Sequence, residues 1–213
     1  MRLDGDDQET YNRYGRDELN TLNREQVRDN LLASGLWLAF RGRPYGFISL
    51  PEVDPHAIFV NAMDTRPLAP DPAIIIAEAA DDFADGMTVI SKLTSGKVYL
   101  CGAPGNTFPK GEAGSVVEST FEGPHPAGLP GTHIHFLAPV SATRTVWYLG
   151  YQDVIAIGRL FKTGRLPVER IVSLAGPAVK RPRLLRTRLG ANTNELIDGE
   201  LVDAEGRVVS GSV

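Results

Sequence analysis

Short apolar runs alternate with amphipathic segments along most of the chain. Residues 57–62, 97–101 and 145–149 read AIFVNA, KVYLC and TVWYL, which are typical of buried strands. Residues 82–94 and 152–162 carry apolar side chains at helical spacing instead. Because strands that alternate with helices usually pair in parallel, the pattern predicts an α/β protein built on a parallel sheet.

The segments around this pattern are less regular. Residues 1–20 are polar and acidic without an apolar period, so we expect a tail or linker there. A helix should begin after Asn23, a good N-cap, and end at Gly35. A weaker strand is expected over residues 116–120, and residues 124–139 should be irregular with a short helix.

The pattern changes near residue 164. Two extended runs, residues 169–175 and 183–189, are joined by a turn-rich linker and followed by a short helix over 192–196 and a strand over 207–213. A hairpin, helix and strand in this order resemble the start of a small β-grasp module that is cut from something longer. We therefore expect three parts: a tail (1–20), an α/β domain (21–165) and a partial β-grasp domain (166–213).

Composition excludes several classes of protein. The chain of 213 residues has 22 basic and 26 acidic residues, a net charge of -4, which does not favour binding to nucleic acid or anionic lipid. No apolar run approaches the roughly 20 residues that cross a bilayer, so no direct membrane span is expected. Cys101 is alone, so no internal disulfide can form, and its apolar strand makes it a core residue rather than a nucleophile.

Three motifs have both a functional and a structural interpretation. His133 and His135 would point the same way in an extended segment, and with His125 they could bind a metal, but no carboxylate lies between residues 123 and 140 to support them, so structural histidines are favoured. The loop over 102–114 lacks the G-x-G-x-x-G pattern of a nucleotide cradle. The basic run KRPRLLRTR is a solvated or partner-facing surface, or else an anion contact.

The segment over residues 36–47, LWLAFRGRPYGF, is the most informative candidate site. Its aromatic rings can form flat apolar walls, and its arginines can donate hydrogen bonds to a carbonyl oxygen. A quinone, a planar ring with two carbonyl acceptors, needs that combination. The alternative is a loop whose aromatics cap the core. The candidate quinone-binding residues are Phe40, Arg41, Arg43, Tyr45 and Phe47.

Several long segments in the same order carry a family resemblance. They include SGLWLAFRGRP, FVNAMDTRPLAPDP, LTSGKVYLCG, FEGPHPAGLPGTHIHFLAPVS, GYQDVIAIGRLFKTG and RIVSLAGPAVKRPRLLRTRLGA. The chain from about residue 22 onward resembles the A subunit of the bacterial sodium-translocating NADH:quinone oxidoreductase. That family is similar in turn to the flavin-bearing NADH-binding subunit of respiratory complex I and to the C subunit of the Rnf complex.

The resemblance implies a Rossmann-like α/β domain followed by part of a soluble-ligand-binding (SLBB-type) β-grasp domain. The flavin-bearing relatives have a glycine-rich loop, at the carboxyl edge of the sheet, where this chain has bulky residues 36–47. They also have an acidic motif whose glutamate before proline is missing from NAMDTRP, residues 61–67. The expected cofactors of this chain are therefore none, with ubiquinone as a ligand and the flavins and iron centres in partner subunits.

The function implied is that of a peripheral subunit on the cytoplasmic side of the bacterial inner membrane. It would dock to the membrane subunits of a translocase for sodium ions and contact ubiquinone, without catalytic residues of its own. Two alternatives remain open: a pure assembly scaffold, and an independent NAD- or flavin-binding oxidoreductase, which the degraded motifs make the weakest.

Overall fold

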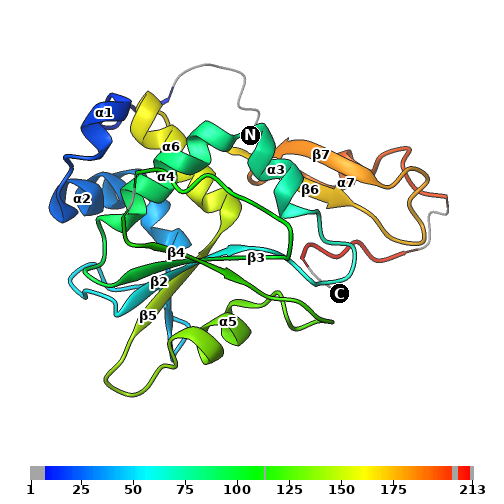
Figure 1. The fold of residues 1–213 in the computed structure, drawn as a ribbon. Coiled ribbons are helices and arrows are strands. Elements are labelled where there is room, and N and C mark those ends of the chain that lie inside the picture. The colour runs from blue at the N-terminus through cyan, green and yellow to red at the C-terminus, as the bar shows by residue number, and fades with distance from the viewer. Residues whose placement is uncertain (1–7, 113, 203–205, 212–213) are drawn as a thin grey trace.

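A computed structural model describes residues 8–112, 114–202 and 206–211. Most of them form a three-layer α/β unit, to which a two-stranded sheet is attached (Figure 1). In spatial order, the strands of the main sheet are β1 (Arg41–Arg43), β5 (Val146–Gly150), β2 (Ala57–Ala62), β3 (Lys97–Gly102) and β4 (Val116–Thr120). The helices of this unit are α1 (Arg16–Leu19), α2 (Arg24–Ser34), η1 (Leu36–Ala39), α3 (Pro72–Glu78), α4 (Ala80–Ser91), α5 (Pro130–Leu137) and α6 (Tyr151–Thr163).

Four of the five strands run parallel, which confirms the predicted α/β sheet. β2 pairs in parallel with β3 and β5, and β3 pairs in parallel with β4. β1 is the exception, because it pairs antiparallel with β5, from Arg41 opposite Tyr148 to Arg43 opposite Val146. The chain leaves β2 toward β3 on one side and later returns to β5 on the other, so the order of strands reverses between β2 and β5.

The two faces of the sheet are covered unequally (Figure 1). Alternate strand residues such as Ile58, Leu100 and Trp147 face the large core that α2, α4 and α6 complete. The intervening residues, including Phe59, face a smaller cluster that α5 covers. Among the described residues, α5 is the one helix on this face, and a groove lies between it and β1.

Helices α4 and α6 pack in close contact through two glycines. A Cβ atom on Gly158 would overlap the backbone oxygen of Asp82, and one on Gly86 would overlap that of Val154. α4 also begins earlier than the predicted residues 82–94, and α3 precedes it. The signal for α3 is local, since Asp71 accepts a hydrogen bond from the Ala73 N–H and Pro72 occupies the first turn.

The predicted tail is wrong for residues 8–20, the part of it that the structure describes. The Tyr11 N–H donates to the Gly164 carbonyl at 2.8 Å, and the Tyr14 ring stacks on Phe161 with centroids 5.7 Å apart. Leu19, in α1, is fully buried. Polar composition is a poor guide here because this segment is held by a few aromatic and backbone contacts rather than by an apolar period.

The attached sheet is an antiparallel hairpin of β6 (Glu169–Leu174) and β7 (Arg183–Arg188), followed by α7 (Thr193–Ile197). Both strands and the short helix confirm the predicted elements. The predicted strand over residues 207–213 is wrong for residues 207–211, which form no strand, while 212–213 lie outside the described residues. Val208 and Val209 are both exposed there, since no neighbouring strand covers them among the described residues.

Candidate functional site

The candidate site is a tight hairpin at the edge of the main sheet. After β1 the chain doubles back, so that the Gly42 N–H donates to the Phe47 carbonyl at 2.7 Å and the Ser49 N–H donates to the Phe40 carbonyl at 3.1 Å. Gly46 makes the reversal with a φ of 75°, a value that glycine adopts without strain. We call residues 41–49 the β1 hairpin.

The position of this hairpin differs from the prediction, which places the segment at the carboxyl ends of the parallel strands. Because β1 is antiparallel, Arg43 lies opposite Val146, the first residue of β5, and the turn that follows continues beyond the amino ends of the strands. The local sequence does not encode this direction of pairing. The antiparallel direction therefore puts the candidate site at the other end of the sheet.

Phe40 does not belong to an accessible site, which corrects one of the five predicted contacts. Its side chain is 0 % exposed and packs in the core with Trp37 and Trp147, at centroid distances of 5.4 and 5.9 Å. The Trp37 indole N–H donates to the Ser49 carbonyl at 2.7 Å and so attaches the hairpin to this aromatic group. For Phe40, the interpretation as a core-capping residue is correct.

The other four candidates are accessible. Tyr45 and Phe47 are 70 % and 74 % exposed, and their rings stack with centroids 6.3 Å apart. Arg41 and Arg43 are two residues apart in a strand, so their side chains leave the same face of the sheet, the face that carries α5. The structure thus brings two exposed rings and two guanidinium groups together on one hairpin.

Arg43 is the most constrained of the four. Its guanidinium carbon lies 5.3 Å from the centroid of the Tyr148 ring, a cation–π arrangement that orients the group. The Nε atom is buried and has no hydrogen-bond acceptor among the described residues. Because Nε is covered by the protein, the donors that Arg43 can offer to a ligand are the terminal N–H groups of its guanidinium.

A groove of about 270 Å³ separates the β1 hairpin from α5. One wall is formed by Arg43 and Pro44, and the other by α5 and the segment after it. The residues of the second wall are Gly131, Ile134, His135, Pro139 and Val140. Sequence reasoning did not connect these five with the hairpin, because they lie about 90 residues after it and nothing local links the two segments.

The histidines do not form the metal-binding arrangement that an extended segment would allow. His133 and His135 lie in a helix, so their side chains point in directions about 200° apart. His133 is buried, its Nε2 lies 2.9 Å from the Ala127 carbonyl, and burial lowers its pKa. Within the described parts of the chain, no group of three His, Cys, Asp or Glu side chains is placed to hold a metal ion.

The crevice where α/β folds usually bind ligands is occupied by the protein itself. It lies at the carboxyl ends of β2 and β5, where the strand order reverses. Over β2, the Asn61 amide donates to the Gly128 carbonyl at 3.0 Å. After β5, the Asp153 carboxylate lies in the first turn of α6 and accepts a hydrogen bond from Arg170 at 2.5 Å. Burial raises the pKa of Asp153, while Arg170 opposes that shift.

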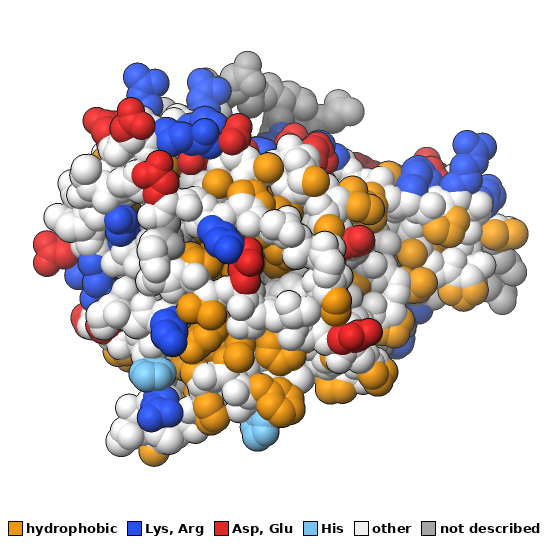
Figure 2. Space-filling model, viewed as in Figure 1, with side chains coloured by type: hydrophobic (Ala, Val, Ile, Leu, Met, Phe, Trp, Pro, Cys, Tyr) orange, Lys and Arg blue, Asp and Glu red, His pale blue; other side chains and the backbone are white. Residues whose placement is uncertain are grey.

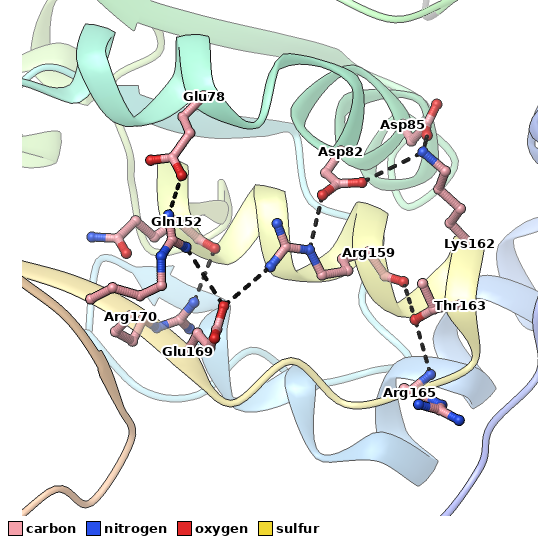
Figure 3. Close-up of polar contacts among 11 residues, drawn as sticks. Glu78, Asp82, Asp85, Gln152, Arg159, Lys162, Thr163, Arg165, Glu169 and Arg170 are labelled. Atoms are coloured by element: carbon pink, nitrogen blue, oxygen red, sulfur yellow. Dashed lines mark hydrogen bonds and ion pairs between the residues drawn. The ribbon is translucent and has the colours of Figure 1, made fainter. Parts of the chain in front are cut away.

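The basic residues of β6 and β7 are largely paired within the molecule, and Figure 3 shows the contacts around Arg170 and Glu169. Arg186 contacts Glu78 of α3 and lies 3.6 Å from Glu169, and Arg183 forms two hydrogen bonds with Glu200, at 2.7 and 2.8 Å. Arg159 of α6 joins the Glu78–Arg186–Glu169 network through Glu169, at 3.9 Å, and also pairs with Asp82 at 2.9 Å. These pairs engage Arg183 and Arg186, whereas Arg181 and Arg188 of the same basic run are exposed.

Charged and apolar side chains are separated on the surface (Figure 2). In this view, charged groups crowd the rim over α1 and the adjacent ends of α4 and α6, whereas apolar groups gather around α5. Phe136 of α5 is among the exposed large apolar side chains, as are Tyr45, Phe47 and Leu50. No helix in the described part of the chain is long and apolar enough to cross a membrane.

Together, these features define a class: an α/β domain with a mostly parallel sheet that carries an antiparallel hairpin module. Residues 22–166 match the family described as NqrA second alpha/beta domain, and residues 171–213 match the NQRA C-terminal domain. The chain therefore belongs to the NqrA family.

Curated relatives carry a consistent name. The chain is 57% identical over 211 residues to the A subunit of the Na(+)-translocating NADH-quinone reductase of Cellvibrio japonicus, covering 99% of this chain and 47% of that protein. The proteins of the same name from Glaesserella parasuis and Pseudomonas aeruginosa are 54% and 56% identical, over 100% and 99% of this chain and 48% and 47% of their own lengths. The chain spans about half the length of these relatives.

Proposed function

We propose that this chain acts as part of a peripheral subunit of a sodium-translocating NADH:ubiquinone oxidoreductase, on the cytoplasmic side of the bacterial inner membrane. The relatives' shared name supports the complex, since identity of 54% to 57% extends over 99% or more of this chain. Docking to the membrane subunits would use the apolar surface around α5 and the β1 hairpin, because exposed apolar patches are typical of interaction sites.

Within this complex, the β1 hairpin would contact ubiquinone. The observation that carries the proposal is Arg43, whose guanidinium is oriented on Tyr148 and donates no hydrogen bond to a described residue, so its terminal N–H groups remain as donors. A quinone carbonyl is an acceptor on a flat apolar ring. Arg41 would donate a second hydrogen bond from the same face, and Tyr45 and Phe47 would pack against the ring.

The chain would hold no flavin, NADH or iron centre of its own. A phosphate needs free backbone N–H groups, and in the β1 hairpin the N–H groups of Gly42, Gly46 and Ser49 already donate to backbone carbonyls. The first turn of α6, which is the other phosphate position in such folds, contains the half-buried Asp153 carboxylate, whose negative charge would repel a phosphate. The flavins and iron centres would then belong to partner subunits.

The alternative is an assembly scaffold without a small ligand, and binding of ubiquinone-1 distinguishes the two. Equilibrium dialysis of the purified chain should give saturable binding. The double variant Arg41→Ala, Arg43→Ala should weaken it about 10- to 150-fold, the effect of losing hydrogen bonds from a charged donor. The matched control Arg181→Ala, Arg188→Ala removes two exposed arginines from the β6–β7 unit and should bind like the parent. No saturable binding by the parent chain would favour the scaffold, and equal binding by parent and hairpin variant would show that the quinone contact lies outside the β1 hairpin.

A further inference from the structure

The β1 hairpin is only one side of a groove whose other side has no assigned role. Arg43 and Pro44 face three residues of α5, namely Gly131, Ile134 and His135, across a space of about 270 Å³. The three α5 residues are separated by three and four positions, so they share one face of the helix. A ligand held by Arg43 therefore meets this helix face as well as the hairpin.

The chemistry of the two walls is complementary to a ring with polar atoms at opposite ends. On the hairpin side, Arg43 lines the groove and its guanidinium donates no hydrogen bond to a described residue. His135 is exposed on the α5 side, in the last turn of the helix, and its ring nitrogens have no hydrogen-bond partner in the described part of the chain. Between the two polar groups, Ile134 and Val140 supply apolar surface.

We propose that the quinone head ring enters the groove between β1 and α5, where His135 forms a polar contact with the carbonyl opposite the one that Arg43 binds. This inference rests on the proposed function and extends it to a second wall. His135 is then a ligand-binding residue, and Ile134 and Val140 make apolar contacts with the ring. A quinone carries carbonyl oxygens on opposite sides of its ring, which matches donors on opposite walls.

Gly131 allows a test that removes no polar group. An added Cβ at this position meets no atom within 4 Å, so the space beside it is open. The substitution Gly131→Leu would therefore fill the groove without displacing the protein. Ala33→Leu is the matched control, because Ala33 is exposed on α2, which packs on the opposite face of the sheet.

The experiment compares binding of ubiquinone-1 to these variants by isothermal titration calorimetry. We expect Gly131→Leu to weaken binding at least tenfold and Ala33→Leu to leave it unchanged. His135→Ala should weaken binding several-fold, and His135→Gln, which keeps an N–H donor, should restore part of the loss. Thermal unfolding of each variant verifies that it is folded.

The outcomes separate this inference from the proposed function. If Arg43→Ala weakens binding but Gly131→Leu and His135→Ala do not, the ring lies outside the groove and the inference is wrong, while the hairpin contact stands. If the parent chain binds no ubiquinone-1, the hairpin contact itself is wrong and the inference is overturned with it.

Discussion

The side-chain amide of Gln152 pairs with the backbone of Ile171 as a neighbouring strand would. Its Nε2 donates to the Ile171 carbonyl at 2.9 Å, and its Oε1 accepts from the Ile171 N–H at 2.9 Å. Arg170 adds hydrogen bonds to the Gln152 carbonyl and to Asp153. A two-stranded sheet is only marginally stable alone, so these contacts at the start of α6 hold the β6–β7 hairpin on the α/β unit.

Replacing Gln152 by leucine should loosen that hairpin without unfolding the sheet. Leucine keeps much of the side-chain volume but loses both hydrogen bonds, each worth about 0.5 to 1.5 kcal/mol. Amide hydrogen exchange should therefore become faster at Ile171 and its neighbours in β6. Amides of β2, the central strand of the main sheet, provide the internal control. Unchanged exchange at Ile171 would mean that other contacts hold the hairpin.

The substitution Gly158→Ala should destabilise the α/β unit. The added methyl group overlaps the Asp82 backbone oxygen, so α4 and α6 must separate, at a cost of about 1 to 3 kcal/mol. Urea unfolding followed by circular dichroism measures the change. Gly131→Ala is the control in a helix with open space, and its stability should stay the same or rise. If Gly158→Ala leaves the free energy of unfolding unchanged, the two helices are not in fixed contact.

Stability should decrease at acidic pH because of His133. Burial lowers the pKa of this side chain in the folded protein, so the unfolded chain binds the additional proton more readily. The free energy of unfolding then has its full value above a pH of about 6.5, the ordinary pKa of histidine, and decreases as the pH falls toward the lowered value in the folded protein.

Urea midpoints above and below this range test the assignment to His133. His133→Gln keeps an N–H group near the Ala127 carbonyl but does not titrate, and its midpoint should depend less on pH than that of the parent. The exposed residues His125 and His135 remain in both proteins. The same pH dependence in parent and variant would assign the effect to other groups.

The regular elements can be predicted from local sequence because their signals are local. The apolar run over residues 57–62 is enough to predict β2, and the helical period of residues 151–163 is enough to predict α6. The ends of α2 are marked by Asn23, whose side chain accepts a hydrogen bond from the Gln26 N–H, and by Gly35, which has a left-handed φ of 77°. The hairpin of β6 and β7 follows from two extended runs around a turn.

The features that sequence reasoning missed depend on contacts between distant residues. Tyr11 is held by Gly164, and Phe40 is buried because Trp147 lies beside it. The groove forms because β1 and α5 are neighbours, so that Arg43 and His135 both line it. The antiparallel direction of β1 places Arg43 at the end of the strand that borders this groove. Four of the five candidate residues lie together on the β1 hairpin, and only the fold decides which end of the sheet they occupy.

A tryptophan placed at the tip of the β1 hairpin tests the central claim most directly. Trp37 and Trp147 are both buried, so the exposed indole of Phe47→Trp reports on ligands that touch the hairpin. The account predicts saturable quenching of this fluorescence by ubiquinone-1, beyond that of a Leu184→Trp control on β7. Quenching that rises without saturation and equally in both variants would contradict contact between quinone and the β1 hairpin.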